Sequence, residues 1–153
     1  MDAQVRPFVQ ILEKLHKDIF EVVAPLTDHE VNWAHPRLSN TIGILLRHVA
    51  GSERYWIAEV AGGGKVIRDR DAEFGREPLR KEQEVARLQA AYEEVRTVLE
   101  SLRAGDLARE VTFGPHDKRR TETASWALLH SLAHTSYHLG QIQLLRKMAE
   151  ARE

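Results

Sequence analysis

Three histidines near the C-terminal end of the sequence follow one another at four-residue intervals, at His130, His134 and His138. In an α-helix, side chains four residues apart lie one above the other on the same face. Two imidazoles arranged in this way can clamp one transition-metal ion, with bonds of roughly 2.0 to 2.1 Å in the case of zinc. Because a pair of histidines alone is a weak site, the pattern calls for a third ligand elsewhere in the chain.

His48 is the best candidate for that third ligand. The side chains that share its face of a predicted helix are Thr41, Ile44, Leu45, Ser52, Tyr55 and Glu59. A lone histidine on such a face is usually a hydrogen-bonded core residue, but a histidine pair on a second core-facing helix favours a shared metal ion. Three neutral imidazoles would leave coordination positions open for water or substrate. We expect His130, one turn earlier, to pack or to support the ligands, although it could exchange roles with His138.

The histidine face of the C-terminal helix also carries apolar residues. At about 100° per residue, His134, His138 and Gln141 lie within about 80° of His130. Within about 60° of the same direction lie Trp126, Ala133, Tyr137, Leu144, Leu145 and Met148. We therefore expect this face to point into the core. A second apolar stripe, on the opposite side, predicts either a further helix contact or a homodimer seam, and it consists of Leu128, Leu132 and Leu139.

Motifs of other metal-dependent enzymes are missing from the sequence. A glutamate would follow the first histidine in the H-E-x-x-H helix of metalloproteases, but Thr135 and Ser136 follow His134. No inward-facing glutamate lies three residues before His134 or His138, as the Glu-x-x-His motifs of di-iron bundles require. The chain has no cysteine, which excludes thiolate ligands, disulfides and cysteine nucleophiles. These absences favour a mononuclear, all-histidine site.

The elements that must position these residues are four long helices. Apolar periodicity predicts them over residues 2–23, 40–60, 78–104 and 122–149. Ser39 or Asn40 can cap the second helix, and Thr121 or Thr123 can cap the fourth. The fold class that follows is all-α, a four-helix bundle in a single domain over residues 1–153.

The connections between these helices differ in length. Residues 24–39 hold at most one short turn, and residues 65–77 form a long surface crossover between the second and third helices. Val111 to Pro115 could be a short extended piece, but we assign no strand to this otherwise polar loop. The long crossover is the main irregularity of the predicted bundle.

Composition limits the classes of partner. The formal charge of −1 comes from 22 basic and 23 acidic residues in even mixture, so no basic surface for nucleic acid is expected. No stretch approaches the roughly 18 to 20 apolar residues of a membrane span, and the N-terminus lacks the pattern of a signal peptide. We therefore expect a cytoplasmic protein whose partners are small molecules.

Two segments, N-T-I-G-I-L-L-R-H-V-A with Tyr55 and Trp56 beyond it, and H-S-L-A-H-T-S-Y-H-L-G-Q, resemble the DinB/YfiT-like family. The resemblance implies that His48, His134 and His138 are the metal ligands. It also implies an up-down-down-up four-helix bundle, frequent homodimers, and zinc or nickel as the ion. Understood relatives are S-transferases and isomerases that use a low-molecular-weight thiol, while others look like hydrolases of small amides.

Three functions follow from these observations. The first is a metal-dependent S-transferase in which a co-substrate thiol is deprotonated at the ion, with His130, Gln141, Tyr55 and Tyr137 as candidates to orient the substrate or support the ligands. The second is metal-assisted hydrolysis, with Glu59 better placed than Glu53 as a general base. The third is a non-catalytic stress-response protein in which metal only stabilises the bundle. To the remaining histidines, which we expect at the surface, we assign no function: His16, His29, His35 and His116.

Overall fold

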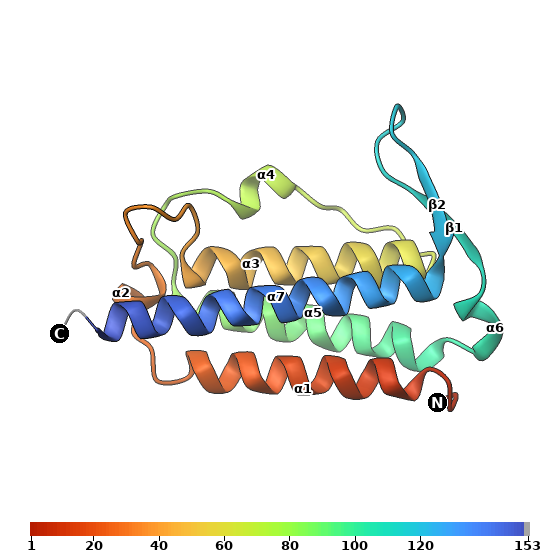
Figure 1. Cartoon of the computed structure of the whole chain (residues 1–153), viewed down its shortest axis with the longest axis horizontal. Coiled ribbons are helices and arrows are strands. Elements are labelled where there is room, and N and C mark those ends of the chain that lie inside the picture. Colours follow the sequence, from red (N-terminus) through yellow and green to blue (C-terminus); the bar gives the residue numbers. More distant parts are fainter. Residues whose placement is uncertain (152–153) are drawn as a thin grey trace.

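The computed structural model describes residues 1–151 and is predominantly helical, in agreement with the predicted all-α class (Figure 1). The long helical segments are α1 (Arg6–Val23), α3 (Ile42–Glu53) with its continuation η1 (Arg54–Ala61), α5 (Lys81–Ser101) and α7 (Ala124–Glu150). The short helices are α2 (Asp28–Val31), α4 (Arg70–Glu73) and α6 (Ala104–Leu107). No helix in this described part of the chain combines the length and the hydropathy that crossing a membrane requires.

The long helices lie side by side around one apolar core (Figure 1). Helix α3 packs against α5 and α7, and α1 packs against α7 and α5. Each contributes fully buried aliphatic side chains, among them Leu12, Leu46, Leu88 and Leu128. Burial of these stripes is what orients each helix, because an amphipathic helix is stabilised mainly by removing its apolar face from water.

Local signals set the ends of these helices. Helix α1 has a proline in its first turn and ends before Pro25. Thr41 caps α3 by accepting a hydrogen bond from the Ile44 N–H, one residue after Asn40 and two after Ser39, the two expected caps. Thr123 caps α7 by accepting from the Trp126 N–H, so of the two expected caps the second is used. The two helices that carry His48, His134 and His138 therefore each start at a defined residue.

The second predicted helix changes its winding part-way. After Glu53 the chain continues as the π-helix η1, whose wider turns end at three glycines. There the Gly62 N–H bonds to the Ile57 carbonyl and the Gly64 N–H bonds to the Ala58 carbonyl. π-Helical turns occur frequently at functional sites. This segment carries Tyr55, Trp56 and Glu59, which line the pocket described below.

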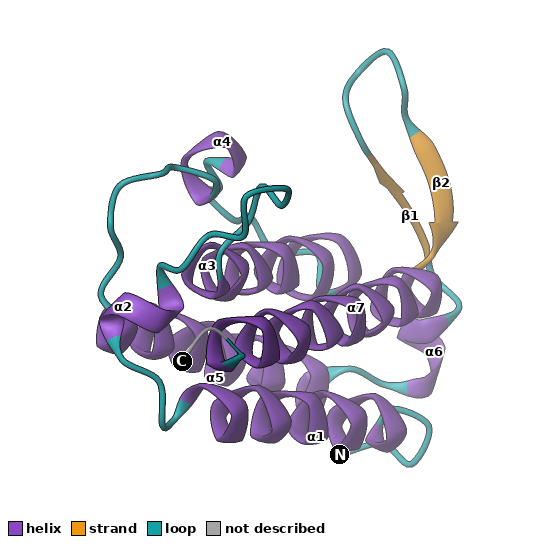
Figure 2. Ribbon diagram, turned by 60° about the vertical axis from the view of Figure 1, so that its left-hand side comes forward, coloured by secondary structure: helices purple, strands orange, loops and turns teal. Residues whose placement is uncertain are grey.

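The loop before α7 is not irregular, as we expected, but forms a β-hairpin (Figure 2). Strand β1 (Glu110–Phe113) pairs antiparallel with β2 (Arg120–Thr123), and Glu110 lies opposite Thr123. Val111 is buried at the base of the hairpin, and Gly114 adopts a positive φ of 95° where the chain turns away. A two-stranded hairpin as short as this is at best marginally stable by itself, and burial of one of its faces against η1 stabilises it.

The orientation of α7 also differs from the expectation. Its buried face contains Leu128, Leu132 and Leu139, the stripe that was a candidate dimer seam. Tyr137 is 64% exposed and Leu144 is 50% exposed, although we expected both in the core. The leucine stripe therefore makes the contacts with the other helices, and the histidines of α7 lie at the border between core and surface.

Candidate metal centre

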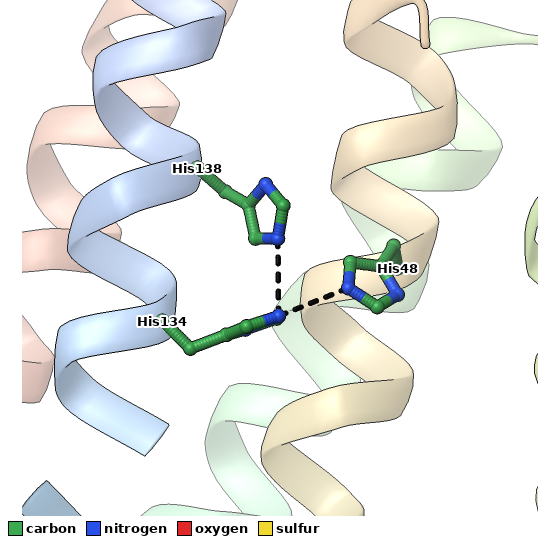
Figure 3. A group of neighbouring side chains, drawn as sticks. All are labelled: His48, His134 and His138. Atoms are coloured by element: carbon green, nitrogen blue, oxygen red, sulfur yellow. Dashed lines mark hydrogen bonds between the residues drawn. The ribbon is translucent and has the colours of Figure 1, made fainter. Parts of the chain in front are cut away.

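His48 of α3 and the pair His134 and His138 of α7 point toward one another across the interface of the two helices (Figure 3). The Nε2 atom of His134 lies 3.0 Å from Nε2 of His48 and 3.0 Å from Nε2 of His138. His48 and His138 are buried, and His134 is partly exposed. One ligand atom from each residue lies within 4.8 Å of the others, so these three histidines could hold one metal ion.

Hydrogen bonds on the far side of two rings determine their tautomers. His48 Nδ1 lies 2.8 Å from Oε2 of Glu73, and a carboxylate can only accept, so Nδ1 carries the proton. His138 Nδ1 lies 2.6 Å from Oε1 of Gln141, whose amide nitrogen donates to the Tyr137 hydroxyl. In both rings Nε2 is therefore free of a proton and presents a lone pair toward His134.

This arrangement fits a cation better than it fits hydrogen bonding. His134 Nε2 has at most one proton to donate, so it would face an unsatisfied lone pair on either His48 or His138. The His134 Nδ1 atom is buried and has no hydrogen-bond partner among the described residues. A divalent transition-metal ion accepts all three lone pairs at once, and outer hydrogen bonds like those to Glu73 and Gln141 are typical of metal-ligating histidines.

Electrostatics favour the neutral imidazoles that bind metals. Burial, assisted by the neighbouring His138 and His48, lowers the pKa of His134 to about 3. Burial also lowers the pKa of His138, against the hydrogen bond to Gln141, which raises it. Protons therefore compete weakly for these two ligand positions near neutral pH.

Glu73 is a residue of the candidate site that the sequence pattern did not identify. It lies on α4 in the crossover, is only 5% exposed, and accepts hydrogen bonds from Arg68 at 2.6 and 2.9 Å besides the one from His48. Burial, the largest influence, raises the pKa of Glu73, but the bonds from His48 and Arg68 together hold it below its usual value. The one local signal was Gly51 in mid-helix, where a Cβ would collide with the Glu73 carboxylate.

Two of the three histidines, His48 and His134, border a cavity of about 590 Å³. It is lined by His48, Ser52, Tyr55, Trp56, Glu59, Val66, Arg68, Arg70, His130 and His134. His130 stacks on Trp126 and meets Trp56 edge-on, with ring centroids 5.0 and 4.4 Å apart. Of the four residues that we expected to orient substrate or support the ligands, His130 and Tyr55 therefore line the pocket, whereas Gln141 and Tyr137 lie behind His138.

Comparison with known proteins identifies the family. A model described as the DinB superfamily matches residues 11–142. The chain belongs to the DinB superfamily. Among solved structures it is similar to the crystal structure of a conserved protein from Enterococcus faecalis, with 14% sequence identity, a TM-score of 0.78 and coverage of 99% of both chains. At that identity the likeness shows the fold alone. No curated protein matches the sequence.

One expectation about the histidines of this DinB-superfamily chain is wrong. His16, expected at the surface, is buried, and its Nε2 lies 2.8 Å from Oε2 of Glu53, which is also completely buried. Glu53 therefore cannot act as a base at the pocket. Its other oxygen accepts a hydrogen bond from Thr135 at 2.8 Å. Glu59, by contrast, lines the pocket, and its Oε2 accepts a hydrogen bond from the Val66 N–H.

Proposed function

We propose that the protein is a metal-dependent enzyme that acts on small molecules, with His48, His134 and His138 as the ligands of one zinc or nickel ion. The observation that carries the proposal is the convergence of three Nε2 atoms beside a cavity of about 590 Å³. A purely structural metal site is usually closed by four protein ligands, whereas a three-ligand site beside a cavity leaves room for substrate.

The reaction that we propose first is thiol-dependent S-transfer. A divalent ion at this position would supply a Lewis acid that favours the deprotonated form of a bound thiol. The chain contains no cysteine, so the thiol must come from a co-substrate of low molecular weight. His130 and Tyr55, both in the pocket wall, can then orient the second substrate, while Gln141 and Tyr137 hold His138 in place.

One observation favours a second reaction, the hydrolysis of small amides. Glu59 is the carboxylate that lines the histidine pocket, and its Oε2 is anchored by Val66 at 2.9 Å. An anchored carboxylate near a metal site can accept a proton from an attacking water. Glu59→Gln distinguishes the two reactions, because it should abolish hydrolysis and leave the binding of a thiol to the metal centre unchanged.

The test of the metal centre is elemental mass spectrometry on protein purified without a metal-affinity tag. Wild type should contain one equivalent of zinc or nickel, and His48→Ala and His134→Ala should contain almost none. The exposed His116 provides the control, since His116→Ala should keep the metal. Glutathione, mycothiol and bacillithiol are then the thiols to assay. A wild type that takes up neither metal would refute the enzyme proposal, and metal without any turnover would favour a structural role.

We also propose the family arrangement for the chain as a whole, an up-down-down-up four-helix bundle that forms homodimers. The stripe of Leu128, Leu132 and Leu139 is buried within one chain and is not available as a seam. Exposed apolar side chains on α7, such as Leu129 and Leu144, are the alternative surface. Sizing chromatography at micromolar concentration tests the homodimer, and a monomer there contradicts it.

A further inference from the structure

A second pocket opens beside the first, between η1 and strand β1. Its volume is about 360 Å³, and its walls are Tyr55, Glu59, Val60, residues 109–114 and Arg119. Tyr55 and Glu59 also line the pocket at the histidines, so the two pockets meet along η1. A ligand whose reactive end lies at the histidines therefore has room to extend toward the hairpin, which stands beside the start of α7 (Figure 2).

The β1 wall of this pocket is a strand edge that has no partner strand within residues 1–151. The Ala124 N–H donates to the Arg109 carbonyl, which makes residue 109 a hydrogen-bonded position of the hairpin ladder. Bonded positions alternate along an antiparallel pair, so residues 111 and 113 also bond to β2, while the backbone groups of Glu110 and Thr112 point away from it. Both residues are exposed and border the second pocket, in which no residue of β2 lies.

Two contacts hold this edge in position relative to the metal centre. The ring of Phe113 meets the ring of Trp56 edge-on with centroids 4.9 Å apart, and Trp56 lies in the histidine pocket. The Arg109 guanidinium donates to the Ala61 carbonyl at the end of η1. Strand β1 is therefore fixed against the same π-helix that supplies the wall shared by both pockets.

The second pocket contains two carboxylates, of Glu59 and Glu110, and two guanidinium groups, of which one is available to bind a carboxylate of a ligand. Arg68 is occupied by Glu73, and Arg109 bonds to the backbone. Arg119, in the second pocket, makes no ion pair or hydrogen bond within residues 1–151. A guanidinium presents a planar pair of donors that matches a carboxylate.

We propose that β1 binds the backbone of a short, extended, peptide-like molecule whose reactive end reaches the three histidines. The N–H and carbonyl groups of Glu110 and Thr112 pair with its amides, as in other cases of strand addition, and Arg119 binds its terminal carboxylate. Glu110 and Thr112 lie roughly 7 Å apart along the strand at about 3.4 Å per residue, which limits the paired part to two or three residues. The inference rests on the proposed function only in naming the reactive end of the ligand.

The experiment compares two proline variants of the hairpin. Thr112→Pro removes an N–H that points into the pocket, and Thr121→Pro removes the equivalent N–H on the outer edge of β2. Neither N–H belongs to the ladder, and each variant breaks the same contact between the two threonine hydroxyls, 2.9 Å in length, so their effects on folding are matched. The probe is S-methylglutathione, which has amides and carboxylates but no thiol, and binding is measured by isothermal titration calorimetry.

Thr112→Pro should bind the probe about fivefold more weakly or worse, because it loses one hydrogen bond to the ligand. Thr121→Pro should bind the probe like wild type. Equal binding by all three proteins, or no binding to wild type at millimolar concentration, would overturn the inference. If the prolines unfold the hairpin, amide hydrogen exchange in wild type decides: saturating probe should slow exchange at Glu110 and Thr112 about tenfold, and unchanged exchange refutes the pairing. Because the probe has no thiol, this result is independent of whether the metal and transferase proposals hold.

Discussion

Two polar clusters that contain histidine lie where α3 meets α7, the inner one together with a residue of α1, and they differ in what completes them. In the inner cluster, His16 meets the buried carboxylate of Glu53, which also accepts a hydrogen bond from Thr135. In the outer cluster, three Nε2 atoms face one another without a carboxylate between them. Glu53 follows His48 on α3 and Thr135 is adjacent to His134 on α7. A shift of little more than one helical turn along α3 therefore separates a cluster in which a carboxylate joins an imidazole to a hydroxyl from one in which three imidazole nitrogens face one another.

The surroundings strengthen the contrast. His16 stacks on Tyr92 with ring centroids 4.5 Å apart and is closed off from solvent. The outer cluster borders a cavity, and its carboxylate, Glu73, binds from behind, at His48 Nδ1, rather than between the rings. The position of the carboxylate thus decides whether the Nε2 atom of its histidine is paired, as in His16, or left free, as in His48. The inner cluster should matter for stability and the outer one for metal binding.

The largest expected effect is on the inner cluster. Glu53→Ala leaves His16 and Thr135 without their acceptor inside the core, so the free energy of unfolding should fall by about 3–5 kcal/mol. Urea denaturation of the metal-free protein measures it. Glu94→Ala, which breaks the partly exposed pair with Arg54, should cost less than about 1 kcal/mol. Similar losses in the two variants would mean that the inner cluster is not a special source of stability.

Next in size is the effect of the carboxylate behind the outer cluster. Glu73→Gln keeps an acceptor for His48 but removes the negative charge that makes this imidazole a stronger ligand, so metal affinity should fall about 10- to 100-fold. Competition with a chromophoric chelator gives the affinity. The stability of the metal-free protein should change much less than in Glu53→Ala. An unchanged affinity would show that Glu73 only anchors the crossover.

A smaller loss of affinity should follow from Gly51→Ala. The added methyl group would collide with the Glu73 carboxylate and push it away from His48. The expected result is about a tenfold weaker metal site. Gly140→Ala on α7 is the matched control, because a Cβ there meets no atom within 4 Å, and it should leave the affinity unchanged. If both variants bind metal like wild type, the close approach of Glu73 to α3 has no bearing on the site.

The last expected effect is a pH dependence of the stability of the metal-free protein. The pKa of His134 is lowered to about 3 by burial and by the neighbouring histidines, below about 6.5 for an unfolded chain. Between these two pKa values His134 is protonated in the unfolded state and neutral in the folded state. The free energy of unfolding should therefore fall as the pH drops from about 6.5 toward 3. Urea titrations at a series of pH values across this range give the free energy of unfolding. Its slope against pH should be shallower for His134→Leu than for wild type or His116→Ala. Equal slopes would exclude His134 as the cause.

Local sequence was sufficient for the helices and for the histidines of the outer cluster. Apolar periodicity predicts the four long segments, and a four-residue spacing places His134 beside His138 whatever the helix packs against. Its place on an apolar helix face selected His48, the family resemblance implied the same residue, and the structure brings all three together. Their role as ligands remains a prediction, since proximity alone does not test it.

Only the tertiary structure decided which face of α7 is buried and which residues complete each cluster. Apolar side chains occur on both sides of this helix, as Leu132 and Leu144 illustrate, so periodicity alone could not choose between them. Glu73 meets His48 at a sequence separation of 25 positions, and His16 meets Glu53 at a separation of 37. No local pattern encodes the register between a loop and a helix, or between two helices, because packing of the whole core sets it.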